Sequence, residues 1–426
     1  MIHSVVQKFV CCLLATLLVM LWFSGCRPFQ NSGGRPECGA TSPTVADECG
    51  NVPTLSENSE SPVEPERGRT EVIEAAIEAA FGAVERDAQG AIIGVDLALE
   101  RASANDEVLK LALTLPNLKK FRLAGGMVSM EGFAVLATQS DLEEIYLQDL
   151  AVRDEEFLSV ISALPRLKRI TLRRLSNLSD MGIVPLFRFP VLRQLSLIDM
   201  LITGDSLRAL GDSKTLVALD VRNCAQLRPE DYDNLSRLPQ LVDLKIGGFA
   251  VDDRCLERIA LMSTLKGLTV DGSLVSAEGF AKFVANSLSA DSMETLVLNR
   301  NMSFSDDTFL ALGNLPRLKR LILGDAMITG TFLERLAEDE QKRPKFYDLA
   351  LRRTFLTETS LAALKKYPEL QILQISGIAL SKEGVQTLLS LPRLERLDLQ
   401  GCSFDEDAQR LLQEQELSQS LKSLQY

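Results

Sequence analysis

The most regular feature of the chain is a short apolar pattern, Leu-x-x-Leu-x-Leu, that recurs from about residue 91 to the C-terminus. The interval is 24 residues from Leu123 to Leu147 and 25 from Leu147 to Leu172, and it stretches to 28 from Val270 to Leu298. A pattern that returns at this period predicts a stack of similar units rather than several independent domains. The final apolar positions of the copies are Leu97, Leu123, Leu147, Leu172, Leu197, Val221, Ile246, Val270, Leu298, Leu323, Leu351, Ile375, Leu399 and Tyr426.

Each copy predicts one strand and one helix. Apolar and outward-facing residues alternate in the Leu-x-Leu part, which is the period of a strand with one buried face. The second part has helical spacing, since Val385, Leu388 and Leu389 fall on one helix face. One strand and one helix cannot bury their apolar faces alone, whereas stacked copies share a continuous core. Helix N-caps are predicted at Ser179, Ser305, Thr357 and Ser381.

These units resemble the leucine-rich repeat over about residues 91–426, and their long helical part resembles the ribonuclease-inhibitor, or cysteine-containing, subclass. The resemblance implies an α/β fold: a right-handed solenoid, or horseshoe, of about 13 to 14 repeats with an inner parallel β-sheet and outer helices. Cys224 and Cys402 lie three residues after the last apolar strand position, where the subclass has a buried cysteine, and Asn301 occupies the same place. We interpret all three as structural.

Residues 1–26 predict a signal peptide. Their apolar core, Phe9–Phe23, is shorter than the roughly 20 residues that span a bilayer as a helix. The end of the segment, Phe23-Ser24-Gly25-Cys26, resembles the lipobox of bacterial lipoproteins, with Phe in place of the usual Leu. The resemblance implies that Cys26 is lipidated and that Arg27 directs the protein to the outer membrane. The alternative is an ordinary cleaved signal that ends near Cys26 by chance.

The residues between the leader and the repeats predict two further segments. Residues 27–69 are rich in Pro, Ser, Glu, Gly, Asn and Thr, a composition that buries too little surface to fold and predicts a disordered tether. Cys38 and Cys49 in this tether are either bridged or separate. Residues 70–90 predict an N-terminal capping helix for the solenoid. The predicted buried face of that helix consists of Ile73, Ile77, Phe81 and Val84.

Composition narrows the range of functions. The single histidine, His3, lies in the predicted leader, so the mature chain would hold none. This excludes Ser-His-Asp and Cys-His nucleophile arrangements and His-ligated zinc. The net charge of −12 argues against nucleic-acid binding, which requires cations to displace counterions from phosphates. We therefore expect a non-catalytic protein without a cofactor or a metal.

Outward-facing positions of the predicted inner sheet are the candidate binding surface. Those of its N-terminal third are basic and surround a tyrosine, and arginine and tyrosine are frequent in the energetic centres of interfaces. This composition predicts contact with an acidic patch on a protein or with an anionic glycan. The alternative is that exposed strand positions are polar for solubility and that long cations only cover apolar stems. The candidate residues are Lys120, Arg122, Tyr146, Arg169, Arg173 and Arg222.

These features favour a membrane-anchored module that faces the cell envelope and binds a protein partner. We expect it to be lipid-anchored or secreted, to be a monomer, and to contact the membrane only through its anchor. The alternative is a cytosolic adaptor of the ubiquitin-ligase substrate-receptor type, since similar repeats occur there. That alternative requires that the leading apolar segment is not cleaved or is not a signal peptide, and no F-box-like helical module precedes the repeats.

Overall fold

The protein is described here from a computed structural model, which describes residues 64–125, 127–418 and 421–426. These residues belong to one compact unit, Ser61–Tyr426. The predicted signal peptide 1–26, the lipidation site Cys26, residues 27–63 of the predicted tether, and Cys38 and Cys49 lie outside the described residues.

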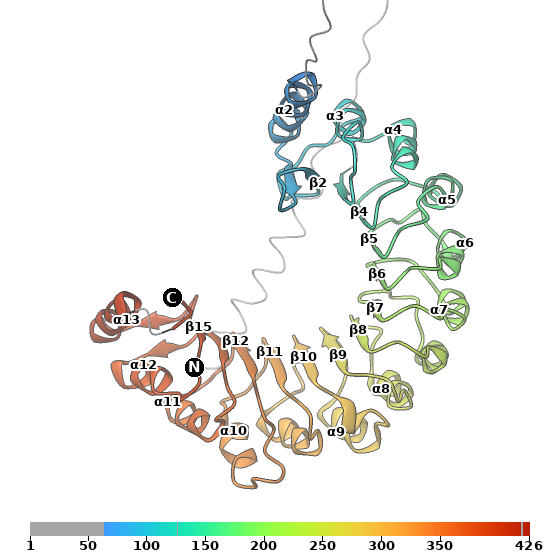
Figure 1. Cartoon of the computed structure of the whole chain (residues 1–426). Coiled ribbons are helices and arrows are strands. Elements are labelled where there is room, and N and C mark those ends of the chain that lie inside the picture. Colours follow the sequence, from blue (N-terminus) through green and yellow to red (C-terminus); the bar gives the residue numbers. More distant parts are fainter. Residues whose placement is uncertain (1–63, 126, 419–420) are drawn as a thin grey trace, which may run out of the picture. The chain divides into compact units, whose positions relative to one another are not determined.

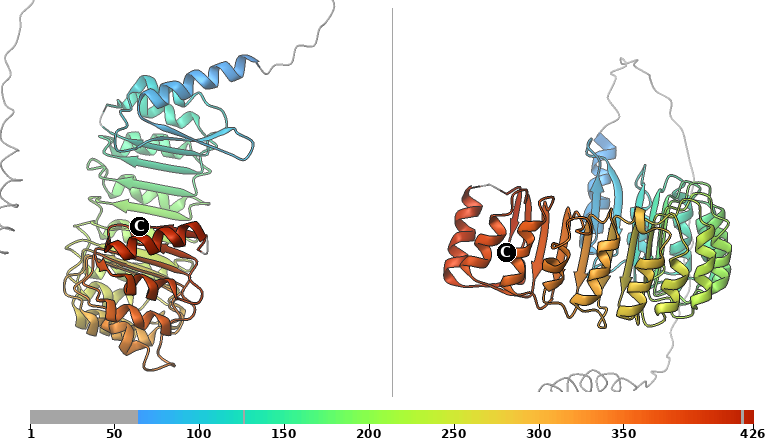
Figure 2. Two further views of the ribbon diagram at one scale, coloured as in Figure 1. Left: turned by 90° about the vertical axis from the view of Figure 1, so that its left-hand side faces the viewer. Right: turned by 90° about the horizontal axis from the view of Figure 1, so that it is seen from below.

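One long β-sheet lines the inner side of the curved unit (Figure 1). It has 15 strands in the order of the sequence, apart from β14, which pairs with β16 in a small separate sheet. Figure 2 shows the strands side by side from two further directions. The strands of the long sheet are β1 (Ala83–Arg86), β2 (Ile92–Leu97), β3 (Lys120–Ala124), β4 (Glu144–Gln148), β5 (Arg169–Arg173), β6 (Gln194–Ile198), β7 (Ala218–Asp220), β8 (Asp243–Gly247), β9 (Gly267–Asp271), β10 (Thr295–Asn299), β11 (Arg320–Gly324), β12 (Asp348–Arg352), β13 (Ile372–Ser376), β15 (Arg396–Asp398) and β17 (Ser423–Gln425), and those of the small sheet are β14 (Ala379–Leu380) and β16 (Ser403–Phe404).

The register of this sheet confirms the predicted repeat. Leu296 pairs in parallel with Leu268 on one side and with Leu321 on the other, so equivalent leucines of successive copies lie next to each other. The degenerate first copy and the truncated last copy follow the same rule, because Val95 pairs with Phe121 and Leu397 pairs with Leu424. The chain is thus an α/β leucine-rich-repeat solenoid, as predicted.

Helices cover the outer side of the sheet (Figure 1). The predicted N-caps are confirmed: the side chains of Ser179, Thr357 and Ser381 accept a backbone N–H of their helices, and Ser305 belongs to a capping box. The helices are α2 (Glu64–Ala79), α3 (Asp106–Ala112), α4 (Met130–Ala134), α5 (Asp154–Ser162), α6 (Asp180–Ile183), α7 (Gly204–Leu210), α8 (Asp253–Ile259), α9 (Ala277–Asn286), α10 (Thr331–Leu336), α11 (Glu358–Leu361), α12 (Lys382–Leu389) and α13 (Glu406–Ser418), with 3-10 helices η2 (Val135–Thr138), η3 (Val184–Arg188), η4 (Pro229–Arg237), η5 (Ala290–Ser292), η6 (Asp306–Asn314) and η7 (Ala362–Lys366).

Several copies form a 3-10 helix where an α-helix was expected. In the 28-residue copy that ends at Leu298, α9 is α-helical over 10 residues. The 25-residue copy that ends at Ile246 has only the 3-10 helix η4 in that place. A 3-10 helix rises about 2.0 Å per residue against 1.5 Å in an α-helix. Copy length alone does not select the 3-10 form, because the 24-residue copy that ends at Val270 contains the α-helix α8.

The N-terminal cap differs from the prediction. The chain is already helical at Glu64, within the predicted tether, and α2 ends at Ala79. Ile73 and Ile77 are buried as expected, whereas Phe81 is 58 % exposed and has a positive φ of 57°. The following residues form β1, which pairs antiparallel with β2. The cap is therefore a helix and a hairpin, and the hairpin covers the hydrogen-bonding edge that a solenoid otherwise leaves open.

A buried polar position links neighbouring copies along the solenoid. Cys224 Sγ donates to the carbonyl of Leu197 at 3.0 Å, and Asn301 Nδ2 donates to the carbonyl of Val270 at 2.9 Å. Cys402 Sγ lies 3.5 Å from the corresponding carbonyl of Ile375. Each acceptor is the last apolar strand residue of the preceding copy, so the structure confirms the structural role predicted for these three residues.

We expect Asn301→Ala to lower the free energy of unfolding by about 2 kcal/mol, because it leaves buried partners without a hydrogen bond. Asn301 is 1 % exposed, and its Oδ1 also accepts from Ser273 Oγ at 2.7 Å. Asn301→Cys should lose less, since a thiol can donate from this place, as Cys224 does. Urea unfolding followed by circular dichroism measures both, and equal losses would contradict the proposed role of the hydrogen bond.

Candidate functional site

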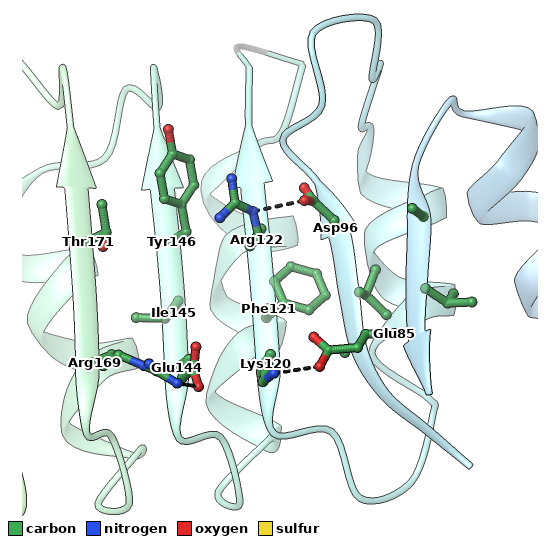
Figure 3. A pocket seen from close by; sticks show the side chains of 14 residues that line it. Glu85, Asp96, Lys120, Phe121, Arg122, Glu144, Ile145, Tyr146, Arg169 and Thr171 are labelled. Atoms are coloured by element: carbon green, nitrogen blue, oxygen red, sulfur yellow. Dashed lines mark hydrogen bonds and ion pairs between the residues drawn. The ribbon is translucent and has the colours of Figure 1, made fainter. Parts of the chain in front are cut away.

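A hollow on the concave face lies at its N-terminal end, over β1 to β5 (Figure 3). Its volume is about 400 Å³. Side chains from five neighbouring strands line it. Figure 3 shows Arg122 and Tyr146 side by side on adjacent strands. The lining residues that carry polar or aromatic side chains are Glu85, Asp96, Lys120, Phe121, Arg122, Glu144, Tyr146, Arg169 and Thr171.

Parallel register brings these side chains together. Arg122 pairs with Asp96 on one neighbouring strand and with Tyr146 on the other, so these residues form one row across the sheet. Lys120 pairs with Glu144, which pairs with Arg169, and this forms a second row. Because alternate residues of a strand point to the same face, each copy contributes two side chains to the hollow.

Opposite charges cancel most of the predicted basic character. Lys120 Nζ lies 2.5 Å from Glu85 Oε1, and Arg122 Nε lies 2.8 Å from Asp96 Oδ2. Arg169 forms an ion pair with Glu144. The hollow therefore presents paired charges of both signs rather than a positive patch. Such a surface suits a polar partner surface with charges of both signs better than a uniformly anionic ligand.

The aromatic ring adds a second type of contact. The Arg122 guanidinium carbon lies 4.3 Å from the centre of the Tyr146 ring, within the range of a cation–π interaction. The Tyr146 hydroxyl bonds to Gln148. Arg122 is thus held by Asp96 and by Tyr146 at once, and this fixes a flat guanidinium and a ring in one orientation at the surface.

Two of the predicted site residues lie outside this hollow. Arg173 lies further along β5, with its Nε 3.5 Å from Asp199. Arg222 follows β7, near the middle of the sheet. Its Nη2 lies 2.8 Å from Asp220 Oδ2, and its Nη1 lies 3.4 Å from Asp271 Oδ2. The structure thus brings together Lys120, Arg122, Tyr146 and Arg169 and separates Arg173 and Arg222 from them.

The pairing of these cations with carboxylates is what the sequence reasoning missed. Asp96 and Glu144 occupy the same outward strand positions as the predicted cations, so aligning the copies would have placed them beside Arg122 and Arg169. Aligning the copies could not have placed Glu85 beside Lys120, because the segment that contains Glu85 was predicted to be helical.

A carboxyl group near the middle of the concave face has an unusual pKa. Burial raises the pKa of Asp243 above its ordinary value of 3.8. The positive charge of Lys245 lowers this pKa, and the negative charge of Asp220 raises it further. Because folding raises this pKa, the ionised carboxylate costs stability. The cost is absent below pH 3.8 and is complete once the pH has risen through the raised pKa.

We therefore expect Asp243→Asn to increase the free energy of unfolding at pH 7 and to leave it nearly unchanged at pH 3, where both side chains are neutral. Urea unfolding at the two pH values measures the difference. A variant that is less stable than wild type at pH 7 would contradict the sign.

Three findings concern metal ligands, thiols and membrane-spanning helices in the part of the chain that the structure describes. No group of three or more metal-ligating side chains occurs among these residues. Cys224 and Cys255 are buried, and burial raises the pKa of their thiols to about 12 and about 11, which keeps them protonated at neutral pH. Over the same residues, none of the helices has the length and apolar character needed to cross a bilayer.

Comparisons with known proteins concern the fold only. No protein-family model matches the chain, and no curated protein matches its sequence. An internalin from Listeria monocytogenes has a similar structure, with 16 % identity, a TM-score of 0.39, and coverage of 83 % of this chain and 93 % of that one. Rad7, solved in its complex with Elc1 in yeast, has 18 % identity and a TM-score of 0.47, covering 81 % and 90 %.

Proposed function

We propose that the chain is a non-catalytic, envelope-facing module that binds a protein partner through its concave face. The observation that carries the proposal is the hollow over β1 to β5, where the oriented Arg122–Tyr146 pair lies among paired charges. Arginine and tyrosine give large contact areas and several hydrogen bonds at little cost in side-chain entropy when they are already fixed. A protein partner fits this mixture of charges better than an anionic glycan does.

The proposal is tested with the full chain carrying a C-terminal affinity tag. We expect Arg122→Ala with Tyr146→Ala to reduce the partner captured from cells at least tenfold, since the loss of one energetic centre costs about 2 kcal/mol or more. Quantitative mass spectrometry compares the captured proteins with those of wild type. Unchanged capture by this double variant would refute the site.

A matched control comes from the C-terminal half of the concave face. Arg320 is half exposed on β11 and its Nε lies 2.9 Å from Asp348, so it reproduces the ion pair of Arg122 without a neighbouring ring. Arg320→Ala should capture as much partner as wild type. An equal decrease in captured partner for Arg320→Ala and for the double variant would indicate a general effect of charge rather than a site in the hollow.

The proposal includes lipid anchoring at Cys26, for which the leader and its lipobox-like end are the support. Several acyl chains give stable membrane attachment, whereas one gives only reversible binding. Cys26→Ser should therefore move the protein from the membrane fraction to the soluble fraction. Wild-type protein found only in the soluble fraction would contradict anchoring and would leave the cytosolic adaptor as the better account.

A further inference from the structure

A row of exposed apolar side chains lies outside the concave face, on the loops that leave the strands. Leu274, Met302, Met327 and Phe355 each follow the last apolar residue of their strand by four positions, in four successive copies. Phe249 follows Ile246 by three positions in the copy before. We call these five residues the apolar ridge. More than half of each residue is exposed, and Phe249 is 85 % exposed.

The ridge is continuous because the strands before it are parallel. Strands β8 to β12 pair in register, so their ends and the loops that follow lie on one edge of the sheet. A hollow of about 810 Å³ lies beside Phe249, Leu274 and Met302. Single exposed apolar residues are common on proteins, whereas a contiguous row of this kind indicates a binding surface.

Other copies do not continue this row. The equivalent positions of three earlier copies hold the small residues Ala151, Ser176 and Ala225. Met127 and Leu201 occupy this position in isolation from each other. The apolar character is therefore a local property of five neighbouring copies and not a requirement of the repeat.

Charges beside the ridge indicate which partner it fits. The charges of two arginines at its edge are balanced by carboxylates. Arg300 Nη2 lies 2.8 Å from Asp271 Oδ2, and Arg353 Nε lies 2.5 Å from Asp325 Oδ1. The helices that begin three or four residues after each ridge side chain have acidic first turns. Three of these carboxylates, those of Asp253, Asp306 and Glu358, accept hydrogen bonds from N–H and hydroxyl groups of the following copy. Within the described residues, no lysine or arginine lies at ion-pair distance from them, so their negative charge is not paired with a cation there.

We propose that the apolar ridge binds a basic amphipathic helix of another protein, a role that goes beyond the proposed function of the concave face. The apolar side of such a helix covers the ridge, and its lysines or arginines meet the acidic helix starts. A second copy of this chain would bring its own acidic row against the first, and an anionic membrane would be repelled in the same way. Both are therefore weaker candidates on charge.

The length of the ridge sets the length of the helix. Neighbouring strands lie about 4.8 Å apart, so five copies cover about 19 Å along the sheet. A helix of about 13 residues has this length at 1.5 Å per residue. A synthetic peptide of about 14 residues, with leucines on one helical face and lysines on the other, is thus a suitable probe.

The test captures the full chain on a biosensor through a C-terminal tag, in detergent-free buffer, and titrates it with the Leu/Lys peptide. We expect saturable binding that weakens as salt is raised. Phe249→Ser with Leu274→Ser and Met302→Ser should weaken binding at least tenfold. Met127→Ser with Leu201→Ser, the matched control at equivalent positions outside the ridge, should leave binding unchanged, and so should the Arg122→Ala and Tyr146→Ala pair.

Further arms of the same experiment identify other occupants. A peptide with the same composition but scrambled leucine positions, and one with Glu in place of Lys, should bind at least tenfold more weakly. Absence of binding by wild type, or equal binding by the ridge variant with an unchanged circular dichroism spectrum, would overturn the proposal. Ridge-dependent binding of anionic vesicles, or a disulfide-linked dimer of a Met302→Cys variant under mild oxidation, would also overturn it.

Discussion

Replacing Phe309 by alanine is expected to lower the free energy of unfolding by about 3 to 5 kcal/mol, the range found when a buried phenylalanine is truncated. Phe309 is 0 % exposed. Its ring centre lies 5.9 Å from that of Phe304 and 5.3 Å from that of Phe332, and Phe304 in turn lies 5.3 Å from Phe280. Phe304 and Phe309 belong to one copy, whereas Phe280 and Phe332 belong to the copies before and after it, so the truncation opens a cavity that adjoins three copies.

Urea unfolding followed by circular dichroism measures the loss. Phe355→Ala provides the control, because Phe355 is 62 % exposed and its truncation should change the free energy of unfolding by less than about 0.5 kcal/mol. A loss below about 1 kcal/mol for Phe309→Ala would mean that the copies do not share a continuous core. Hydrogen exchange should also show faster exchange in the copies on both sides of the cavity.

The second large effect concerns a hydrogen-bonded link between helix starts. Asp253, at the start of α8, accepts from the backbone N–H and the hydroxyl of Ser276, the N-cap of α9, each at 2.7 Å. The Ser276 hydroxyl accepts from the N–H of Gly279 at 3.0 Å. A Cβ on Gly279 would lie 1.9 Å from Asp253 Oδ1, so the carboxylate would have to move and release both bonds.

Gly279→Ala should therefore lower the free energy of unfolding by about 2 to 3 kcal/mol, the cost of breaking hydrogen bonds to a charged group. A loss of stability is informative, because helix propensity alone predicts that replacing a helical glycine by alanine stabilises the protein by about 1 kcal/mol. Gly68→Ala in α2 is the control, since no atom lies within 4 Å of the added Cβ, and it should be neutral or stabilising. Thermal unfolding compares the variants, and a Gly279→Ala protein as stable as wild type would disprove the link.

The same link recurs along the solenoid. Asp106, Asp154 and Glu358 bond to the N-cap serines of the following copies, and a glycine lies three residues after each serine. The sequence shows this as Ser-x-x-Gly at Ser129, Ser179, Ser276 and Ser381. We predicted N-caps at two of these positions but not the contact between copies, because one helix start gives no sign of which carboxylate approaches it.

Apolar periodicity was enough to predict the repeated strands, because they depend on one local pattern that recurs. The buried positions of Cys224 and Asn301 followed from the resemblance to the cysteine-containing subclass of the repeat. Apolar periodicity failed at the N-terminal cap. The helical spacing of Ile73 and Ile77 continues formally to Phe81 and Val84, yet β1 forms there because it pairs with the open edge of β2. That pairing is a property of the assembled sheet and leaves little trace in the local sequence.

The candidate site was predicted in part for the same reason. Outward strand positions identified Lys120, Arg122, Tyr146 and Arg169, which the structure brings into one hollow. Their net electrostatic character was not evident from single copies, because each cation is balanced by a carboxylate on a neighbouring strand. Charges in a parallel sheet have to be considered across the register and not along the chain.

The most direct test of binding through the concave face places a photo-crosslinking amino acid at Thr171, which lies beside Tyr146 on that face. The control places the same amino acid at the exposed Gln386 of α12, on the outer side. Irradiation of cells that contain the full chain should give one discrete adduct with another protein from position 171 and none from position 386. Adducts from position 386 alone, with none from position 171, would contradict binding through the concave face.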